Sequence, residues 1–473
     1  MAIPVLTISQ IRAWEEASWA DGCVPKNVVA KVGRLIAEQL LDHSAPKQRI
    51  LVLAGRGLNG ADATATIQHI LARNPVLLDV EDPEEALPAL HDQLASRPDL
   101  ILDGLFGIGL NRPLSEAWKR LINVVNESGI PIVALDVPSG LNADTGQPEG
   151  AAIQANWTIT LGAPKVGLLK NSAAPFVGKL VVLPDIGLSA MPEVETPLLW
   201  MERSDFRDYP PQRPVNSNKG NFGHAVLVAG SPGYHGAAVI ASRGAQRAHP
   251  GLVTVVTHEW VYFPVASQTQ AVMVRSWKPQ EPLPAKTTAL LYGPGMGVPD
   301  QPELIKQEVQ RNWMKLPVPV VVDASALDWV PPGSETPPGL RVITPHPGEA
   351  ARLLGLSADE IQDDRVGALR QLSNRLGHCW VVLKGSHTLV GRSTGPILVN
   401  SSGNALLGQG GSGDLLSGFI TGLLAQPGLQ SDPAKVLSFA VWAHGEAADA
   451  LSASRPNWII EDLAAQLGLR PGS

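Results

Sequence analysis

Short apolar runs alternate with segments of helical periodicity through the first half of the chain. The runs predict buried strands, because each is short and is closed by a polar turn that contains glycine. They span 50–54, 76–80, 100–103 and 131–137. Strands that alternate with helices predict a parallel sheet covered on both faces.

Three helical segments are predicted around these strands. They cover 7–41, 63–73 and 115–127. Thr7 or Ser9 is placed to cap the first helix, Pro25 breaks it, and Ser115 caps the third. Each strand of this half is therefore followed by polar residues at its carboxyl end, where ligands of parallel sheets bind.

The second half of the chain repeats this alternation. Its strand-like runs span 224–230, 252–257, 271–276, 289–292, 318–322, 341–344 and 380–383. Helices are predicted over 237–248, after Glu349 and after Asp414. This half is again α/β with a mostly parallel sheet.

The periodicity is lost between about 184 and 218. Six prolines and scattered charges fall in this stretch, which is typical of a linker. We therefore expect two domains, 1–209 and 210–473.

Composition narrows the class of protein. The 473 residues carry a net charge of −7, and only 17% are charged, which argues against a nucleic-acid partner. No apolar run is long enough for a bilayer, and no signal peptide is visible, so we expect a cytoplasmic protein with no membrane partner. Cys23 and Cys379 are far apart, which argues against a disulfide framework and a cysteine metal site.

The stretch 408–416 is the strongest chemical signal. Its glycine loop runs into a helix start and offers unpaired N–H groups and the positive end of a dipole, which is an anion site. Asp414 follows the glycines. It is either a base that faces the reacting group or a cap of the helix.

Other strand ends of the second half carry groups for the same cleft. A rigid glycine loop covers 293–297. After the run at 341–344, we expect Glu349 to cap the next helix and His346 to contact a ligand. Lys384 is either a phosphate contact or a surface lysine.

Polar side chains follow three strands of the first half. They are Asn59, Asp62, Asp103, Asp136 and Ser139. Their oxygens suit a hard cation and a polar ligand. Asp and Asn are also ordinary turn formers, but three such turns in register favour a site. Gly55, Gly57 and Gly60 have the spacing of a dinucleotide fingerprint, but Asp62 follows at once where a helix face should pack, so the match is weak by itself.

The motifs together resemble one family, the bifunctional NAD(P)H-hydrate repair enzymes. The resemblance covers nearly the whole chain and lies in 59–62, 103–109, 136–146, 162–165, 219–220, 236–237, 293–295, 323–324, 344–349, 383–385 and 410–414. It implies an N-terminal NAD(P)HX epimerase, a Rossmann-like three-layer αβα domain. It also implies a C-terminal ADP-dependent NAD(P)HX dehydratase with a ribokinase-like α/β fold.

The substrate implied by this resemblance is NADHX or NADPHX, the reduced dinucleotide with water added to its nicotinamide ring. In the epimerase, K⁺ would be held at Asn59, Asp103 and Ser139, and Asp136 would act in proton transfer. The positions that match hydrate binding are Leu58, Asn59, Gly60, Ala61, Asp62, Gly107, Ile108, Gly109 and Asp136.

In the dehydratase half, the resemblance implies phosphorylation of the hydrate's hydroxyl by ADP or ATP with Mg²⁺. Asp414 matches the base, and the N–H groups of 411–413 would hold the phosphoryl group. Positions that match nucleotide binding are Lys384, Gly385, Ser386, His387, Thr388 and Gly413. Those that match hydrate binding are Ala237, Gly295, Gly297, His346 and Asp414.

The chain departs from the family at the first glycine loop. The family reads Asn-Asn-Gly-Gly-Asp-Gly, where this chain has Leu58, Ala61 and Ala63 at the first, fourth and sixth positions. Leu58 removes an amide and the alanines add methyl groups, so we expect reduced epimerase activity. In the other half, Ser325 replaces a usual aspartate and His249-Pro250 replaces a small pair.

Two rival functions remain on the sequence alone. One is a ribokinase-type small-molecule kinase with a non-catalytic N-terminal domain. The other is a nucleotide-binding regulator without turnover. Relatives form ring-like assemblies, which leaves a homo-oligomer open.

Overall fold

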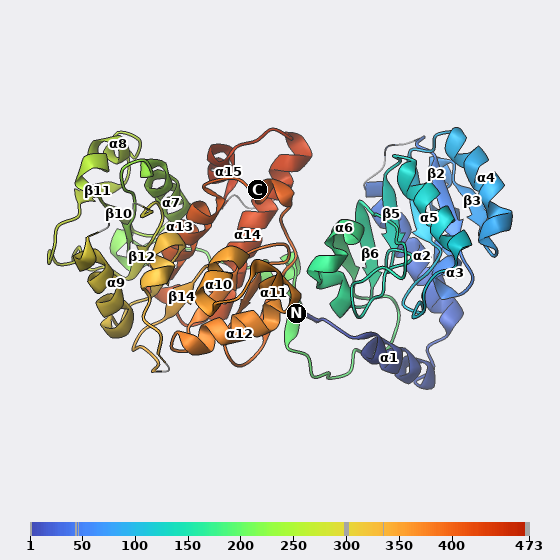
Figure 1. Cartoon of the computed structure of the whole chain (residues 1–473), viewed down its shortest axis with the longest axis horizontal. Coiled ribbons are helices and arrows are strands. Elements are labelled where there is room, and N and C mark those ends of the chain that lie inside the picture. Colours follow the sequence, from blue (N-terminus) through green and yellow to red (C-terminus); the bar gives the residue numbers. More distant parts are fainter. Residues whose placement is uncertain (1, 43–44, 46, 298–301, 334, 469–473) are drawn as a thin grey trace. The chain divides into compact units, whose positions relative to one another are not determined.

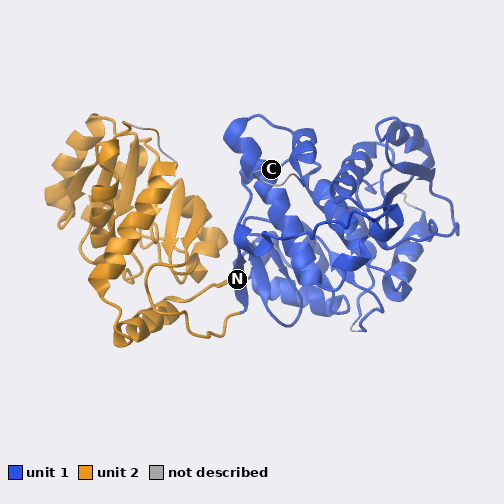
Figure 2. Ribbon diagram, turned by 180° about the vertical axis from the view of Figure 1, so that it is seen from behind, with its two compact units in different colours: residues 1–2, 197–473 blue, residues 3–196 orange. Residues whose placement is uncertain are grey.

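The computed structural model describes residues 2–42, 45, 47–297, 302–333 and 335–468. It divides into two compact units, one formed by 3–196 and the other by Ala2 and the residues from Pro197 onward (Figure 2). The boundary therefore falls 13 residues before the expected one (209 − 196 = 13).

The N-terminal unit is built on one parallel sheet with the strand order β3-β2-β4-β5-β6-β7. The strands are β2 (Ile50–Ala54), β3 (Val76–Asp79), β4 (Leu100–Gly104), β5 (Ile132–Leu135), β6 (Trp157–Leu161) and β7 (Lys179–Leu183), and a short β1 (Ile3–Pro4) precedes them. The first four were expected from the sequence, and β6 and β7 were not.

Helices cover both faces of this sheet (Figure 1). They are α1 (Ile8–Ala20), α2 (Pro25–Asp42), α3 (Leu58–Thr66), α4 (Pro83–Ala95), α5 (Glu116–Glu127) and α6 (Ala174–Val177). Alternate residues of one strand enter different cores: Val52 packs in the cluster of α2, and Leu51 packs in the cluster of α4 and α5. The expected three-layer αβα architecture is confirmed.

The helix expected over 63–73 begins earlier than predicted, because α3 starts at Leu58 and ends at Thr66. Two 3-10 turns, Ile67–His69 and Leu71–Arg73, continue the helical segment to the expected end. Gly57 stands before it with φ of +102°, which permits a sharp turn straight out of β2. Gly60 then packs so closely that a Cβ there would lie 1.8 Å from the Gly55 carbonyl oxygen. Gly57 therefore lies immediately before the helix, and Gly60 lies in its first turn, packed against the backbone that follows β2.

The C-terminal unit holds a sheet in which β8-β17-β16-β15-β14-β13-β12-β9-β10-β11 are successive neighbours. They are β8 (Leu198–Met201), β9 (His224–Val228), β10 (Leu252–Thr257), β11 (Met273–Ser276), β12 (Ala289–Tyr292), β13 (Val320–Val322), β14 (Arg341–Ile343), β15 (Trp380–Leu383), β16 (Leu389–Gly391) and β17 (Ile397–Asn400). Among these strands, β16 is antiparallel to both neighbours and the other pairs are parallel.

The strand β8 corrects the expected linker. It lies inside 184–218 and pairs in parallel with β17, and its Trp200 is 1% exposed. Its partner follows almost 200 residues later in the chain, so local periodicity gave no sign of the pairing.

The helices of this unit are α7 (His235–Arg247), α8 (Tyr262–Ala266), α9 (Glu303–Lys315), α10 (Pro347–Leu354), α11 (Ala358–Asp363), α12 (Arg365–Arg375), α13 (Ser412–Leu424), α14 (Pro433–Ser454) and α15 (Ile460–Gln466). Helix α13 packs on α7 through glycines. A Cβ on Gly418 would lie 1.9 Å from the Ala241 carbonyl oxygen, and one on Gly244 would lie 2.1 Å from that of Leu415. This close crossing fixes the start of α13 over the sheet.

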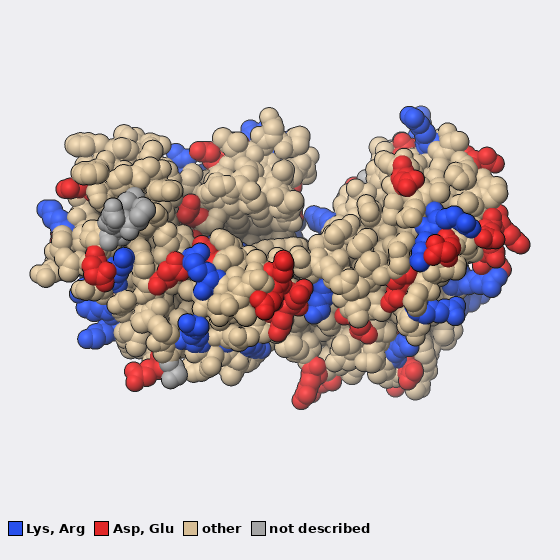
Figure 3. All heavy atoms as spheres, in the orientation of Figure 1, with Lys and Arg blue, Asp and Glu red and all other residues tan. Residues whose placement is uncertain are grey.

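On the face seen in Figure 3, basic and acidic side chains are interspersed and form no single basic stripe. Within the described residues, no helix combines the length and the apolar character that a bilayer span requires.

Candidate functional site

A cavity of about 880 Å³ opens beyond the strand ends of the N-terminal unit. Its wall includes seven of the residues expected to bind the hydrate, namely Leu58, Asn59, Asp62, Gly107, Ile108, Gly109 and Asp136. Gly60 is turned toward the Gly55 backbone, and Ala61 is exposed on the outer side of α3. The structure therefore gathers residues from three separate turns around one space, as the register of the strand ends predicts.

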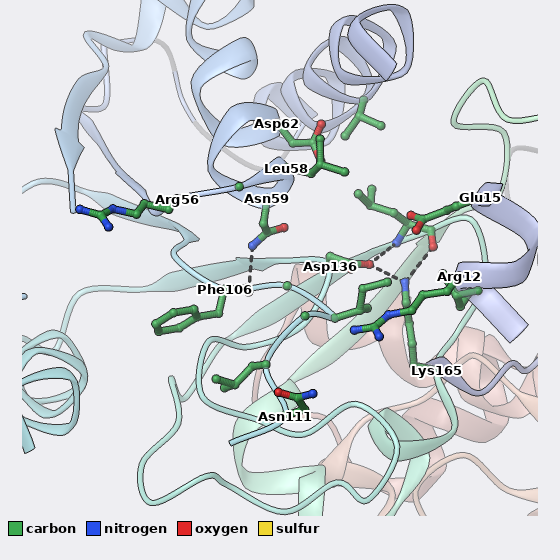
Figure 4. Close-up of a pocket in the computed structure, with 18 of the residues that line it drawn as sticks. Arg12, Glu15, Arg56, Leu58, Asn59, Asp62, Phe106, Asn111, Asp136 and Lys165 are labelled. Carbon is green, nitrogen blue, oxygen red and sulfur yellow. Dashed lines mark hydrogen bonds and ion pairs between the residues drawn. The ribbon is translucent and has the colours of Figure 1, made fainter. Parts of the chain in front are cut away.

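Asp136 lies at the end of β5 and is ion-paired with Lys165 (Figure 4). The Leu161 N–H also donates to Asp136 Oδ1 at 3.1 Å. Lys165 is 1% exposed and donates to Thr160 Oγ1 and the Leu161 carbonyl at 2.9 and 2.8 Å. Asp136 has φ of +65°, a left-handed conformation that is rare outside glycine and is often retained at functional sites.

Two more carboxyl groups lie near this pair. Asp62 lines the cavity from α3, and its pKa is raised to about 8, mainly by burial and then by the charges of Asp136 and Glu15. Glu15 projects from α1, and burial followed by the Asp136 charge raises its pKa. Sequence reasoning missed Glu15 because it precedes Asp136 by more than 100 residues. It also gave Lys165 no role, although Lys165 stands in a recognised motif.

The oxygens expected to bind a cation also come together. Ser139 donates from Oγ and N to the two Asp103 oxygens at 2.6 and 2.9 Å. The Phe106 N–H donates to Ser139 Oγ at 2.8 Å, and Asn59 Nδ2 donates to the Phe106 carbonyl at 2.9 Å. Asp103 is fully buried, and this burial raises its pKa to about 6 although neutral donors partly oppose the shift. Carboxylate, hydroxyl, amide and carbonyl oxygens therefore meet where a positive charge would be stabilised.

The altered glycine loop leaves the cavity open. Ala61 is exposed, and the methyl of buried Ala63 faces Gly104, where a Cβ would approach it to 2.5 Å. The methyl groups of Ala61 and Ala63 therefore point away from the cavity and do not narrow it. Leu58 is 55% exposed at the cavity wall, so the missing amide remains the relevant change.

In the C-terminal unit, Asp414 is the third residue of α13. Gly411 is the N-cap with φ of +93°, and no side chain caps this helix start. The cap interpretation of Asp414 is therefore wrong. Its pKa is raised to about 6, first by burial and then by the Asp323 charge, while Lys384 opposes the shift.

Lys384 is not a surface lysine. Its Nζ lies 3.0 Å from Asp323 Oδ1 and 3.8 Å from Glu349 Oε2. A Cβ built on Gly413 would lie 3.1 Å from this ammonium group, so Lys384 faces the first turn of α13. The ammonium group and the unpaired N–H groups of the helix start thus converge on one point, where an anion would be held.

His346 and Glu349 cap α10 reciprocally. His346 Nδ1 accepts from the Gly348 and Glu349 N–H groups at 3.0 and 3.3 Å, and Glu349 Oε2 accepts from the His346 N–H at 2.8 Å. Both His346 and Glu349 therefore cap the helix, whereas a capping role was expected for Glu349 alone. The His346 side chain is 56% exposed, so ligand contact through its outer edge stays a prediction.

Arg365, at the start of α12, binds the backbone of the loop 384–388 through hydrogen bonds. Its guanidinium donates to the carbonyls of Leu383 and Lys384 at 3.2 and 3.4 Å, and to that of Ser386. Gly385 and Ser386 are exposed in this loop, where a nucleotide was expected. Sequence reasoning missed Arg365, because its partners are backbone atoms that leave no sequence signal.

Three of the five residues expected to bind the hydrate in this unit, Ala237, Gly295 and Gly297, lie close to Tyr234. A Cβ on Gly295 would lie 2.5 Å from the Tyr234 carbonyl and 2.9 Å from the Ala237 Cβ. Gly297 faces the Tyr234 ring, and that side chain is 52% exposed.

No group of three or more His, Cys, Asp or Glu side chains in the described ranges is arranged to hold a metal ion.

Comparison with known proteins matches both units. The family model described as NAD(P)H-hydrate dehydratase matches residues 225–467, and the one described as YjeF-related protein N-terminus matches 76–167. The altered glycine loop lies outside the second match.

The chain is similar over most of its length to curated proteins. It is 32% identical to a bifunctional NAD(P)H-hydrate repair enzyme of Coxiella burnetii, over 93% of each chain. It is 38% identical to one of Vibrio cholerae, over 77% of this chain and 72% of that protein. A solved ribokinase-like superfamily protein of Enterococcus faecalis has a TM-score of 0.51 at 24% identity, covers 59% of this chain and 96% of its own, and confirms the fold of the C-terminal unit.

Proposed function

The chain belongs to the bifunctional NAD(P)H-hydrate repair enzymes, and we propose from this premise that its two units carry out successive steps on hydrated NADH or NADPH. The N-terminal unit interconverts the R and S hydrates. The C-terminal unit dehydrates the S hydrate at the expense of ADP. The observation that carries this proposal is the convergence of Asp414, Lys384 and the start of α13 on one point.

In the dehydratase step, Asp414 accepts the proton of the hydrate's hydroxyl. The hydroxyl oxygen forms a bond to the terminal phosphorus of ADP, and the bond from that phosphorus to AMP breaks. The C–O bond then breaks and releases phosphate, while the neighbouring ring carbon loses a proton and the double bond returns. The N–H groups of Gly411 and Gly413 and the ammonium group of Lys384 stabilise the charge on the phosphoryl oxygens, while the Ser412 N–H donates to the Gln409 carbonyl at 3.3 Å.

We place the nucleotide over the loop 384–388, in which Gly385 and Ser386 are exposed next to Lys384. Mg²⁺ would be carried by the phosphates with few protein ligands, which agrees with the lack of a three-ligand cluster among the described residues. Bound there, it would supply positive charge to the phosphate oxygens. Asp323 and Glu349 hold Lys384 in place for the same task.

In the epimerase unit, Asp136 transfers a proton, and its ion pair with Lys165 holds the carboxyl group in position. Asn59, Asp103 and Ser139 would hold K⁺, because Asp103 is a buried carboxylate that accepts hydrogen bonds from neutral donors. Bound K⁺ would supply the missing positive charge.

We expect the N-terminal unit to unfold at higher temperature in KCl than in NaCl, and Asp103→Asn to remove this difference.

Product analysis separates this function from a small-molecule kinase. The intact chain is given ADP with separated R and S hydrates, and both free phosphate and the absorbance of reduced nicotinamide are followed. We expect one phosphate for each reduced nicotinamide formed. A stable phosphorylated product would instead support the kinase, and retention of function in Asp414→Asn would support a regulator.

A further inference from the structure

One carboxyl oxygen in the N-terminal cavity has no partner. Asp62 is 7% exposed, and its Oδ1 makes no hydrogen bond to any described residue. A buried polar atom without a partner destabilises the folded state, and such atoms are rare in native proteins. Since Asp62 also lines the cavity, the missing partner is expected to come from a ligand.

Asp62 and Asp136 lie in opposite electrostatic settings. Asp136 is ion-paired with buried Lys165. Asp62 has no cationic partner among the described residues, and burial, followed by the charges of Asp136 and Glu15, raises its pKa to about 8. At neutral pH Asp62 therefore carries a proton, whereas Asp136 faces an ammonium group, an arrangement that lets Asp62 act as the acid and Asp136 as the base.

The two groups reach the cavity from different elements. Asp62 projects from α3, whereas Asp136 and Lys165 follow β5 and β6 and lie beside Glu15 of α1 (Figure 4). In Figure 4, Asp62 stands apart from the group formed by Asp136, Lys165 and Glu15. A flat ring bound between them would present one face to each side.

The reaction needs such a pair. Water that adds to the reduced ring places its hydroxyl on the carbon next to the ring nitrogen, because nitrogen stabilises positive charge there. When the C–O bond is the one that breaks, inversion at that carbon requires the hydroxyl to leave from one face and water to arrive on the other. The leaving oxygen needs a proton, and the arriving water must lose one.

We propose that Asp62 is a second catalytic residue of the epimerase cavity, which gives its proton to the departing hydroxyl while Asp136 takes a proton from the incoming water. The inference rests on the proposed epimerase function. The C–O bond breaks with its electron pair leaving on water, and the ring nitrogen shares its lone pair with the carbon. Solvent water then bonds to the other face, and its proton passes to Asp136.

The balance closes within the site. One proton leaves Asp62 and one arrives at Asp136, and the reverse inversion runs with the two roles exchanged. Exchange with solvent restores the starting form. Glu15 is a positioning residue here, because its negative charge favours the protonated form of Asp62. The charged groups that act on Asp62 are Asp136 and Glu15, and those that act on Glu15 are Asp136, Lys165, Arg12 and Glu16.

The first test uses the full chain without ADP on purified R hydrate, with formation of the S hydrate followed by chromatography. We expect Asp62→Asn to lower the epimerisation rate 10²–10⁴-fold, the usual contribution of a general acid. Asp62→Glu should restore part of the rate. Dehydration of S hydrate with ADP should stay unchanged in both variants, and the unfolding midpoint of the N-terminal unit is measured beside the rates.

Isotope and pH measurements test the step itself on the unaltered chain. In H₂¹⁸O we expect one solvent oxygen in the hydrate for each inversion. The rate should fall as pH rises through about 8, because Asp62 loses its proton there. Glu15→Gln should move this fall to lower pH, because loss of a neighbouring negative charge lowers the pKa of Asp62. Glu16→Gln, on the exposed side of α1, should leave it in place.

The outcomes are separable. If the unaltered chain does not interconvert the hydrates, the epimerase function itself fails. If it does so, but Asp62→Asn keeps its rate within twofold or inversion proceeds without solvent oxygen, Asp62 is not the acid. An alkaline fall that Glu15→Gln does not move would refute the role given to Glu15.

Discussion

Asp414 stands in the first turn of α13, with Asp323 and Glu349 raising its pKa and Lys384 opposing them. A carboxyl with a pKa of about 6 is ionised at neutral pH, yet is more basic than an exposed aspartate. Such a group suits general-base work at neutral pH. Its residue type was readable in the sequence, whereas its basicity depends on neighbours from three other segments of the chain.

This setting predicts the pH dependence of dehydration. Activity should rise with pH through about 6, because Asp414 must lose its proton before it can accept one from the hydrate. Asp323→Asn removes a like charge, lowers the pKa of Asp414 and should move the rise to lower pH. The rate of S hydrate dehydration with ADP is measured from pH 5 to 9. Asp328→Asn, whose carboxylate pairs with Arg352 on the surface, is the control and should not move the rise.

A second residue-level prediction concerns Leu58. Leu58→Asn returns the amide of the family pattern to the cavity wall, and one added hydrogen bond of about 1 kcal/mol corresponds to a fivefold gain in epimerase kcat/KM. Leu58 is half exposed, so the change should leave the unfolding midpoint in place. Leu71→Asn, at an exposed position outside the cavity wall, is the matched control. A gain in both variants, or in neither, would contradict this role.

At the scale of elements, the ends of helices and strands position the chemistry. The start of α13 is fixed by its glycine contacts with α7, and the loop after β15 is fixed by Arg365 of α12. Burial lowers the pKa of Arg365 to about 10, so the guanidinium remains charged at neutral pH while it binds backbone carbonyls. A rigid loop loses less entropy when it binds a nucleotide.

Arg365→Gln should therefore weaken ADP binding about tenfold, a change of about 1.4 kcal/mol. Binding is measured by calorimetry with the full chain. Arg370 lies on the same helix and also donates to two carbonyls, those of Arg392 and Gly395, but these lie outside the nucleotide loop. Arg370→Gln is thus the control, and equal losses in the two variants would show a general effect on stability.

At the scale of the whole molecule, each unit has its own sheet and its own core, and each contains one of the two proposed catalytic carboxylates. The dehydratase consumes one epimer, and the epimerase replaces it from the other. Joining both activities in one chain lets a mixture of hydrates be repaired completely. Each site should therefore be removable without loss of the other.

A mixture of equal R and S hydrates gives the measurement. With ADP, the unaltered chain should recover all of the reduced nicotinamide. Asp136→Asn should stop near half, since only the S hydrate is dehydrated and spontaneous inversion is slow on this timescale. Asp414→Asn should recover almost none and yet interconvert the hydrates. A loss of both activities from either single change would contradict independent sites.

The sequence by itself determined what local patterns encode. Apolar runs placed β2, β4, β9, β12 and β15 within a few residues, and the glycines before Asp414 marked an anion site, because a helix start exposes N–H groups in any fold. The family motifs supplied both activities. The glycines at 55–60 were harder, since a loop and a tightly packed helix start share the same residues.

Only the tertiary structure decided which distant residues meet. It added β8 to the C-terminal sheet, brought Glu15 and Lys165 to Asp136, and placed Lys384 against the start of α13. These contacts join segments separated by up to about 200 residues and leave no local periodicity. Charge also depends on burial, so the contrast between Asp62 with its proton and Asp136 with its ammonium partner exists only in the folded chain.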